Sequence, residues 1–210
     1  MLKPLYVPEL SRSHISENAE SYETVLSYLA SPELAIDAAL GKVTLALIKP
    51  SLETAMLDTQ PMSDAKAADT LEEEITNLGI GLKFSVTLDL ATVDAFYDGQ
   101  PKYGSMLPNP PLTSPKYPSR WEEFVDLMTS GPVTILILRD EESKAVERWR
   151  SQLGHWDVEA RRDPNTIRGR HARGNHNNLL HGSDSPGSAV REIRIIGSLL
   201  SNKIALVRDR

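Results

Sequence analysis

The sequence predicts one domain that mixes α-helices with a β-sheet. Two short apolar runs rich in strand formers, VTLALI at residues 43–48 and VTILIL at 133–138, are typical of buried strands. Helical stretches, two of which end at a glycine, lie between and after these runs. Because several elements are short and the strands can pair in either sense, this order leaves open both a doubly wound sheet and an α+β sandwich.

Each strand is predicted from its own pattern. The run at 43–48 is continuously apolar and stops at Lys49-Pro50, because proline cannot donate a hydrogen bond to a sheet. Residues 82–90 alternate apolar and polar side chains, which is the period of a strand. The run at 133–138 follows the turn formed by Ser130-Gly131-Pro132.

Helices are predicted between and around these strands. Gly79 and Gly154 are placed to close two of them, since glycine accepts the left-handed conformation that often ends a helix. Six prolines within 100–119 predict an extended loop instead. The predicted helices cover residues 22–29, 64–78, 92–97, 120–128 and 141–153, and a last one follows Pro186.

The predicted domain organisation follows from these elements. We expect residues 1–40 to form an extension outside the core, residues 41–200 the folded domain with a proline-rich insertion at 100–119, and residues 201–210 a tail. No apolar run is long enough to cross a bilayer, so no membrane partner is expected. The N-terminus lacks both a signal-type apolar region and an acid-free, arginine-rich character, so a cytoplasmic protein is expected, with a mitochondrial location as the alternative.

Charge and cysteine content narrow the chemistry. The chain has no cysteine, which excludes disulfides, thiolate zinc sites and cysteine nucleophiles. Its net charge is -6, yet residues 161–173 hold five arginines against one acid. A local basic segment in an acidic protein predicts a small polyanionic ligand rather than a long nucleic acid, with a solvated charged loop as the alternative.

The densest polar segment is NLLHGSDS at residues 178–185, just before the helix that follows Pro186. Ser185 can cap that helix, so its backbone N–H groups and positive dipole end lie near His181 and suit a phosphoryl group. A neutral imidazole has a ring nitrogen free to attack phosphorus, and Glu192 is placed to hold the other nitrogen. The alternative, that His181 only satisfies backbone groups in a turn, stays open here.

Three cations lie where side chains could converge on phosphates. Lys49, Arg150 and Arg168 fall at element ends or in loops, and the chain has no GxxxxGK[ST] loop, so side chains would have to hold any nucleotide. His171, His176 and His181 could instead belong to a metal or nucleic-acid hairpin. A spacing of five puts successive side chains on different helix faces, so no protein metal ligand is expected.

The segment 178–185 matches the signature Asn-x-x-His-Gly-Ser-Asp-Ser, and on it the chain resembles the nucleoside diphosphate kinase family. The resemblance implies an α+β fold, a ferredoxin-like sandwich with an antiparallel four-stranded sheet. It also implies ping-pong transfer of the γ-phosphate of a nucleoside triphosphate to a nucleoside diphosphate. Supporting segments in family order are LALIKP at 45–50, Phe96-Tyr97, MTSGP at 128–132, Trp149-Arg150, PNTIRG at 164–169 and Arg191-Glu192-Ile193.

The resemblance implies a role for each matching residue. His181 would carry the phosphate as an intermediate, and Ser183 and Glu192 would position it. ATP would be the phosphate donor, with Mg²⁺ bridging the nucleotide phosphates, and the protein would be a homo-oligomer. The residues implied to contact phosphates and ribose are Lys49, Tyr97, Arg150, Arg168 and Asn178.

Several departures make the chain similar to the divergent branch of the family. Trp156 stands where a threonine is usual, and the segment after Pro50 is about ten residues longer, with Ser51 in place of an acid. Arg170 and His176 replace residues more typical of the loop before the signature, and the base-stacking aromatic falls near Trp121. A catalytically weak or inactive nucleotide-binding regulatory protein of the same fold is therefore the alternative.

Overall fold

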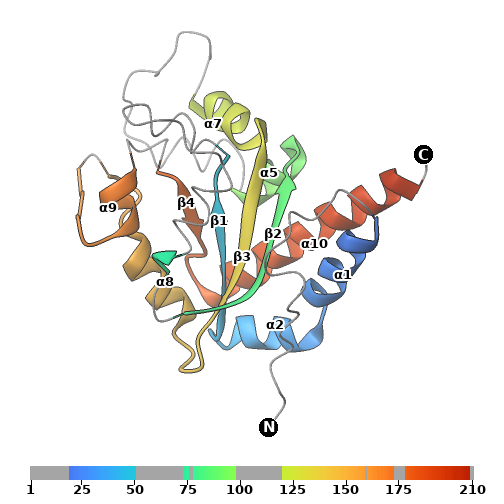
Figure 1. Ribbon diagram of the computed structural model, residues 1–210, viewed down its shortest axis with the longest axis horizontal. Coiled ribbons are helices and arrows are strands. Elements are labelled where there is room, and N and C mark those ends of the chain that lie inside the picture. The colour runs from blue at the N-terminus through green and yellow to red at the C-terminus, as the bar shows by residue number, and fades with distance from the viewer. Residues whose placement is uncertain are drawn as a thin grey trace.

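The structure is a computed structural model that describes residues 19–50, 73–75, 78–97, 120–158, 160–172 and 178–208 (Figure 1). The helices are α1 (Ala19–Leu29), α2 (Pro32–Ala39), α5 (Leu90–Phe96), α7 (Arg120–Thr129), α8 (Ala145–Leu153), α9 (Ile167–His171) and α10 (Pro186–Arg208). The strands are β1 (Val43–Ile48), β2 (Gly79–Thr87), β3 (Pro132–Arg139) and β4 (Leu180–Gly182). No helix within these ranges is long and apolar enough to cross a membrane.

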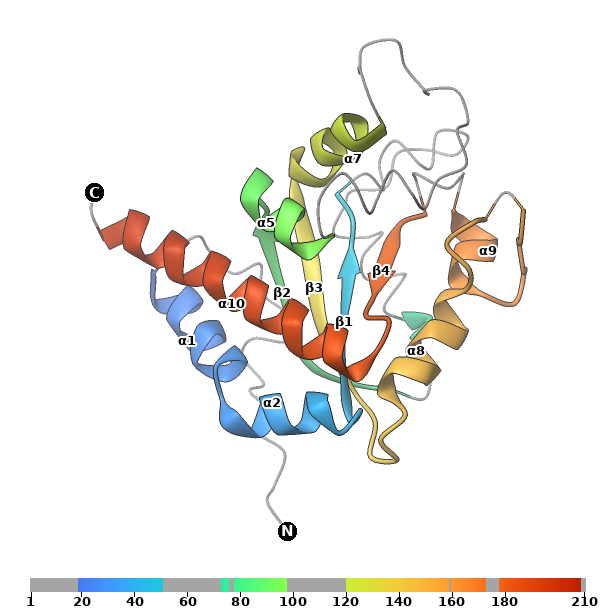
Figure 2. The ribbon, with the colours of Figure 1, turned by 180° about the vertical axis from the view of Figure 1, so that it is seen from behind.

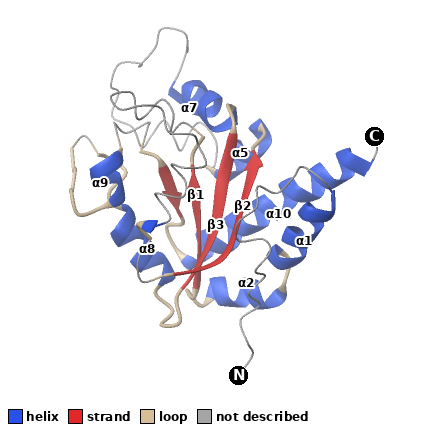
Figure 3. Ribbon diagram, in the orientation of Figure 1, coloured by secondary structure: helices blue, strands red, loops and turns tan. Residues whose placement is uncertain are grey.

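The four strands form one sheet in the order β2-β3-β1-β4 (Figure 3). Every neighbouring pair is antiparallel, with Leu45 of β1 opposite Ile137 of β3 and Leu47 opposite His181 of β4. This pairing excludes the doubly wound alternative and confirms the antiparallel four-stranded α+β sandwich. The short strand β4 lies at one edge, beside the central strand β1.

Both faces of the sheet are covered, which explains why the central strands are continuous apolar runs. Leu45 and Leu47 of β1 point into a core built with α1, α2, α5, α7 and α10. Ala46 and Ile48 point to the opposite face, where a smaller cluster includes Trp149 and Leu153 of α8. Figure 2 shows α10 crossing one face, with α8 and α9 lying beside the β4 edge.

The described part of the predicted N-terminal extension, residues 19–40, packs against the core. Tyr22 and Val25 of α1 and Leu34 of α2 are buried in the same cluster as β1. The cause is α10, which runs to Arg208 and offers α1 an apolar surface that includes Ile204 (Figure 2). Residues 201–208 accordingly continue a helix, and the domain boundaries remain a prediction.

Three element boundaries differ from the sequence predictions. Gly79 begins β2 and closes no helix, and the strand ends at Thr87 because Asp89 caps α5, its carboxylate accepting from the N–H of Thr92 at 2.7 Å. The helix expected from residue 141 begins at Ala145, since the buried Asp140 carboxylate accepts from the N–H of Lys144 at 2.7 Å. Most of the helix predicted at 64–78 and all of the loop at 100–119 lie outside the described residues.

Candidate functional site

His181 is fixed by its backbone on the edge strand β4. It pairs with Leu47 of β1, and its carbonyl accepts from the indole N–H of Trp149 at 3.3 Å. The next residue must be glycine, because a Cβ at Gly182 would lie 2.3 Å from Nε1 of Trp149. The strand therefore holds the imidazole at a defined height above the sheet edge.

The imidazole is oriented by a buried carboxylate on α10. Nε2 of His181 lies 3.1 Å from Oε2 of Glu192, a residue that is only 2% exposed. Ser183 Oγ donates to the same carboxylate oxygen at 2.7 Å and also contacts the backbone of Leu45. Among the described residues no hydrogen bond engages Nδ1 of His181, so Nε2 is the tethered nitrogen.

Two aromatic side chains form a wall beside the imidazole. Phe96 and Tyr97 meet the His181 ring edge to face, with centroids 4.9 and 5.5 Å away. Tyr97 also packs edge-on against Phe124, at 4.7 Å. Arg191 holds this corner by donating to the carbonyls of Ala95 and Phe96, at 2.8 and 3.1 Å. The ring of His181 is therefore confined on one side and tethered through Nε2.

Lys49 and Asn178 supply a buried polar pair at the end of β1. Lys49 is 6% exposed and its Nζ donates to Oδ1 of Asn178 at 2.6 Å, with the ring of Phe124 at 5.2 Å. Burial, and secondarily the charge of Arg168, lower the pKa of Lys49 to about 7. The ammonium group therefore sits where a charge is costly and where an added anion would be favourable.

Arg168 is the second buried cation. It is 7% exposed and donates to the carbonyls of Gly154 and Leu180, at 3.0 and 2.5 Å. Its Nε is buried and has no hydrogen-bond partner within the described part of the chain. Burial, and then the neighbouring charge of Arg150, lower the pKa of Arg168 to about 10. Like charges gathered at such cost are typical of a polyanion site.

The eight predicted site residues fall into one region, linked in three ways. His181, Ser183 and Glu192 share one hydrogen-bond set, Lys49 and Asn178 form a separate hydrogen bond, and the charge of Arg168 acts on Lys49. Tyr97 contacts the His181 ring, and Arg150, which forms an exposed ion pair with Asp184, acts on Arg168. These residues lie in α8, α9, β4 and α10 or directly beside β1, α5 and β4.

Sequence reasoning assigned no role to four residues that shape this region: Phe96, Trp149, Asp184 and Arg191. All four stand out in the sequence only as parts of the segments that match the family. Arg191 contacts the end of α5 across about 95 positions of sequence, and the residues around Arg191 do not predict this contact. Trp121, near the expected base-stacking position, is 8% exposed and packs against Phe124 in the core.

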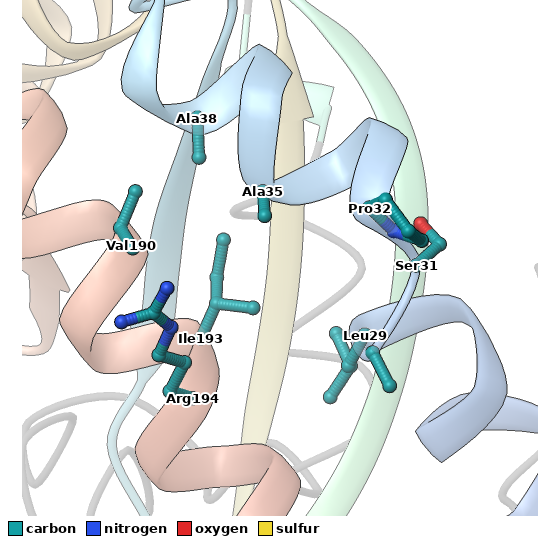
Figure 4. A pocket seen from close by; sticks show the side chains of 9 residues that line it. Leu29, Ser31, Pro32, Ala35, Ala38, Val190, Ile193 and Arg194 are labelled. Atoms are coloured by element: carbon teal, nitrogen blue, oxygen red, sulfur yellow. The ribbon is translucent and has the colours of Figure 1, made fainter.

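A separate cavity of about 190 Å³ lies between α2 and α10 (Figure 4). Its lining is mostly apolar, including Leu29, Ala35 and Ile193, and its polar side chains are Ser31 and the charged Arg194. It holds no histidine and none of the predicted site residues. Within the described ranges no group of three histidine, aspartate or glutamate side chains gathers to hold a metal ion.

Comparison with known proteins gives a consistent result. The family model for nucleoside diphosphate kinase matches residues 115–198. The probable nucleoside diphosphate kinase 5 of Arabidopsis thaliana is 32% identical over 130 residues, covering 58% of this chain and 78% of the relative. The enzyme of Mycobacterium sp. (strain MCS) is 37% identical over 114 residues, covering 50% and 69%.

Other relatives match over a shorter length. The nucleoside diphosphate kinase of Corynebacterium glutamicum is 44% identical over 73 residues, covering 35% of this chain, and the chain spans about half, 52%, of that relative. The solved Aquifex aeolicus nucleoside diphosphate kinase superposes with a TM-score of 0.50 at 27% identity, over 74% of this chain and 94% of that one. The Encephalitozoon cuniculi structure, at 23% identity, TM-score 0.52 and coverage of 73% and 87%, supports the fold alone.

Proposed function

The chain belongs to the nucleoside diphosphate kinase family, and from that premise we propose that it transfers the γ-phosphate of a nucleoside triphosphate to a nucleoside diphosphate through a phosphohistidine at His181. The observation that carries the proposal is the tether of Nε2 to Glu192. With the Nε2 proton donated to this carboxylate, the lone pair of the imidazole lies on Nδ1. Nδ1 is then the nucleophile.

The first half-reaction is a substitution at phosphorus. Nδ1 attacks the γ-phosphorus, the bond from phosphorus to the bridging oxygen breaks, and the nucleoside diphosphate leaves with that electron pair. The ring becomes cationic, and the negative charge of Glu192 stabilises it without moving the Nε2 proton. Ser183 keeps the carboxylate in place. The second half-reaction reverses these steps with a different nucleoside diphosphate.

The cations supply the electrostatic part of the mechanism. We assign Lys49, Arg150 and Arg168 to the nucleotide phosphates, because phosphoryl transfer depends mainly on positioning and on stabilising charge. Asn178 orients Lys49 through its 2.6 Å hydrogen bond, and Tyr97 braces the imidazole. Before the nucleotide binds, these positive charges repel one another; the polyanion relieves that repulsion.

Mg²⁺ fits this site as an ion that enters with the nucleotide. The described residues gather no protein cage for it, while three cations are available for phosphates, which suits a metal held mainly by phosphate oxygens. The ion would neutralise part of the phosphate charge. Asp184, paired with Arg150, is the acidic side chain of the signature available to it.

The proposal is tested with γ-labelled ATP and Mg²⁺. We expect acid-labile, base-stable label on the protein that passes to added GDP. His181→Ala should take no label, whereas His155→Gln, which changes a histidine outside the site, should be labelled like the wild type. An unlabelled wild type, or equal labelling of His181→Ala, would refute the assignment. Nucleotide binding without label would favour the regulatory alternative.

Assembly, location and domain limits complete the proposal. We propose that the protein is a homo-oligomer, that it is cytoplasmic with a mitochondrial location as the alternative, and that residues 41–200 form its catalytic domain. The burial of α1 against α10 supports adding residues from 19 onward to that folded unit. Sedimentation of the purified chain tests the homo-oligomer, and fractionation of its source cells tests the location. A protein truncated to begin at residue 41 tests the domain limits, and it should unfold if α1 and α2 complete the core.

A further inference from the structure

Helix α9 carries Arg168 but is too short to be stable by itself. It has five residues, fewer than isolated helices need, so side chains must hold it. Thr166 caps its start by accepting from the N–H of Gly169 at 3.1 Å. At its end, Arg162 donates to the carbonyls of Gly169 and Ala172, both at 2.8 Å. The direction of the Arg168 guanidinium therefore depends on contacts made by the rest of α9.

Glu74 contacts the end of α9 through both of its carboxylate oxygens, although it lies about a hundred positions earlier in the chain. Oε2 accepts from Nη2 of Arg170 and Oε1 lies against Nε2 of His171, each at 2.5 Å. The side chains of Glu74 and His171 are partly buried, and that of Arg170 is exposed. Burial alone would raise the pKa of Glu74, but the hydrogen bonds from Arg170 and His171 outweigh it and hold this pKa below its ordinary value. Glu74 is therefore an anion at neutral pH.

Arg168 of the same helix reaches the edge of the sheet. It donates to the carbonyl of Leu180 on β4, next to His181, and to the carbonyl of Gly154 at the end of α8. Arg162, Arg168 and Arg170 put three positive charges on or beside one turn of helix. The Glu74 carboxylate offsets part of this charge and anchors α9 through Arg170 and His171, separately from the contacts of Arg168.

We infer that Glu74 is a positioning residue: by binding Arg170 and His171 it holds α9 so that Arg168 meets the nucleotide phosphates. The inference rests on the proposed function. It assigns a task to an acid that follows the lengthened segment after Pro50, and to Arg170, which stands where the family usually has another residue. Glu74 does not touch the nucleotide; it acts through Arg168.

The test compares two variants that each remove one carboxylate charge from an arginine ion pair. Glu74→Gln keeps the size of the side chain. Glu23→Gln is the control, because Glu23 pairs with Arg208 at 2.5 Å where α1 meets α10, and α1 and α9 lie at opposite ends of the molecule (Figures 1 and 2). We expect the Kd for a nucleoside diphosphate to rise about three- to tenfold in Glu74→Gln, in keeping with the loss of a partly exposed charged pair, and to stay within about twofold in Glu23→Gln.

A double-mutant cycle separates positioning from general stability. In an Arg168→Lys background, Glu74→Gln should change the Kd by less than about twofold, because the side chain through which it acts has already been replaced. An equal effect in both backgrounds would overturn the inference. So would a Glu74→Gln protein whose melting temperature falls while its Kd is unchanged, since that is the behaviour of a purely structural ion pair.

Failure of this inference can be told from failure of the proposed function. If the wild type transfers label to GDP and Glu74→Gln binds nucleotide as Glu23→Gln does, only the role of Glu74 is wrong. If the wild type neither binds nor transfers, both are wrong. Should Glu74→Gln fail to fold, Arg170→Gln removes one of the two contacts and must weaken binding in the same direction. Loss of folding in both variants would also overturn the inference.

Discussion

Lys49 should take up a proton when a nucleotide binds. Its pKa is lowered to about 7 by burial and by Arg168, so at pH 8 only about one molecule in eleven carries the charge. Phosphates placed against the ammonium group favour its charged form and move the pKa back toward the ordinary 10.5. Binding at pH 8 should therefore be accompanied by uptake of about 0.9 proton per site.

The sign of the pH dependence follows from the same shift. The complex holds more protons than the free protein at any pH between the two pKa values, so affinity falls as pH rises through this window. The fall should be about tenfold per pH unit above 7, since each unit of pKa shift corresponds to about 1.4 kcal/mol. Below pH 7 Lys49 is charged in both states and this dependence disappears.

Calorimetric titration with a nucleoside diphosphate at pH 8, in two buffers of different ionisation enthalpy, measures the uptake. At that pH the phosphates themselves are ionised, because their second pKa is about 6. Lys49→Arg is the control: a guanidinium stays charged throughout, so its uptake should vanish and its affinity should be flat with pH. Uptake below about 0.2 proton in the wild type, or the same uptake in Lys49→Arg, would refute the reasoning.

Three further substitutions test other parts of the structure. Ser183→Ala removes the donor to Glu192 and should slow phosphohistidine formation about ten- to a hundredfold, measured by rapid-quench labelling; an unchanged rate would mean that the carboxylate needs no support. Thr44→Val removes a buried hydroxyl that has no partner among the described residues and should raise the free energy of unfolding by about 1 kcal/mol in urea, where a loss would contradict the burial argument. Gly182→Ala forces a Cβ toward Trp149 and should lower the melting temperature by several degrees, whereas a wild-type melting curve would show that the indole can move.

Three of the four strands could be predicted from sequence, but β4 (Leu180–Gly182) and the pairing of the strands could not. A run such as 43–48 needs only its apolar residues to indicate a buried strand, and β1 has the predicted bounds. The direction of pairing depends on which elements cover each face, and local patterns do not contain that information. The antiparallel sheet was implied only by the family resemblance.

The amphipathic helix at 22–29 shows the limit of local reasoning most clearly. Its period was readable, but the surface that buries Tyr22 and Val25 belongs to α10, at the other end of the chain. A pattern predicts that a helix has an apolar face, and the tertiary structure decides what covers it. The boundary errors at Thr87 and Ala145 have a local cause instead, since aspartate side chains that accept from an N–H three and four positions later fix where α5 and α8 begin.

Part of the geometry of the candidate site could be read from local sequence. The signature placed His181 and Ser183 together, and the helix after Pro186 brings Glu192 back toward them. Contacts made across the chain were not readable: Glu74 meets α9 from nearly a hundred positions away, and Arg191 reaches the end of α5 from a similar distance. Such pairs become visible only once the backbone is folded.

The contact between Arg168 and Leu180 has a consequence for solubility. The outer carbonyl of a sheet edge is an acceptor that another chain could pair with, and native proteins cover or charge such edges. Here the guanidinium of Arg168 takes the carbonyl of Leu180, so a side chain assigned to phosphate also closes the end of the sheet. Replacing Arg168 would therefore remove a phosphate contact and also leave the carbonyl of Leu180 free to pair with a strand of another chain. Aggregation would then accompany the catalytic defect.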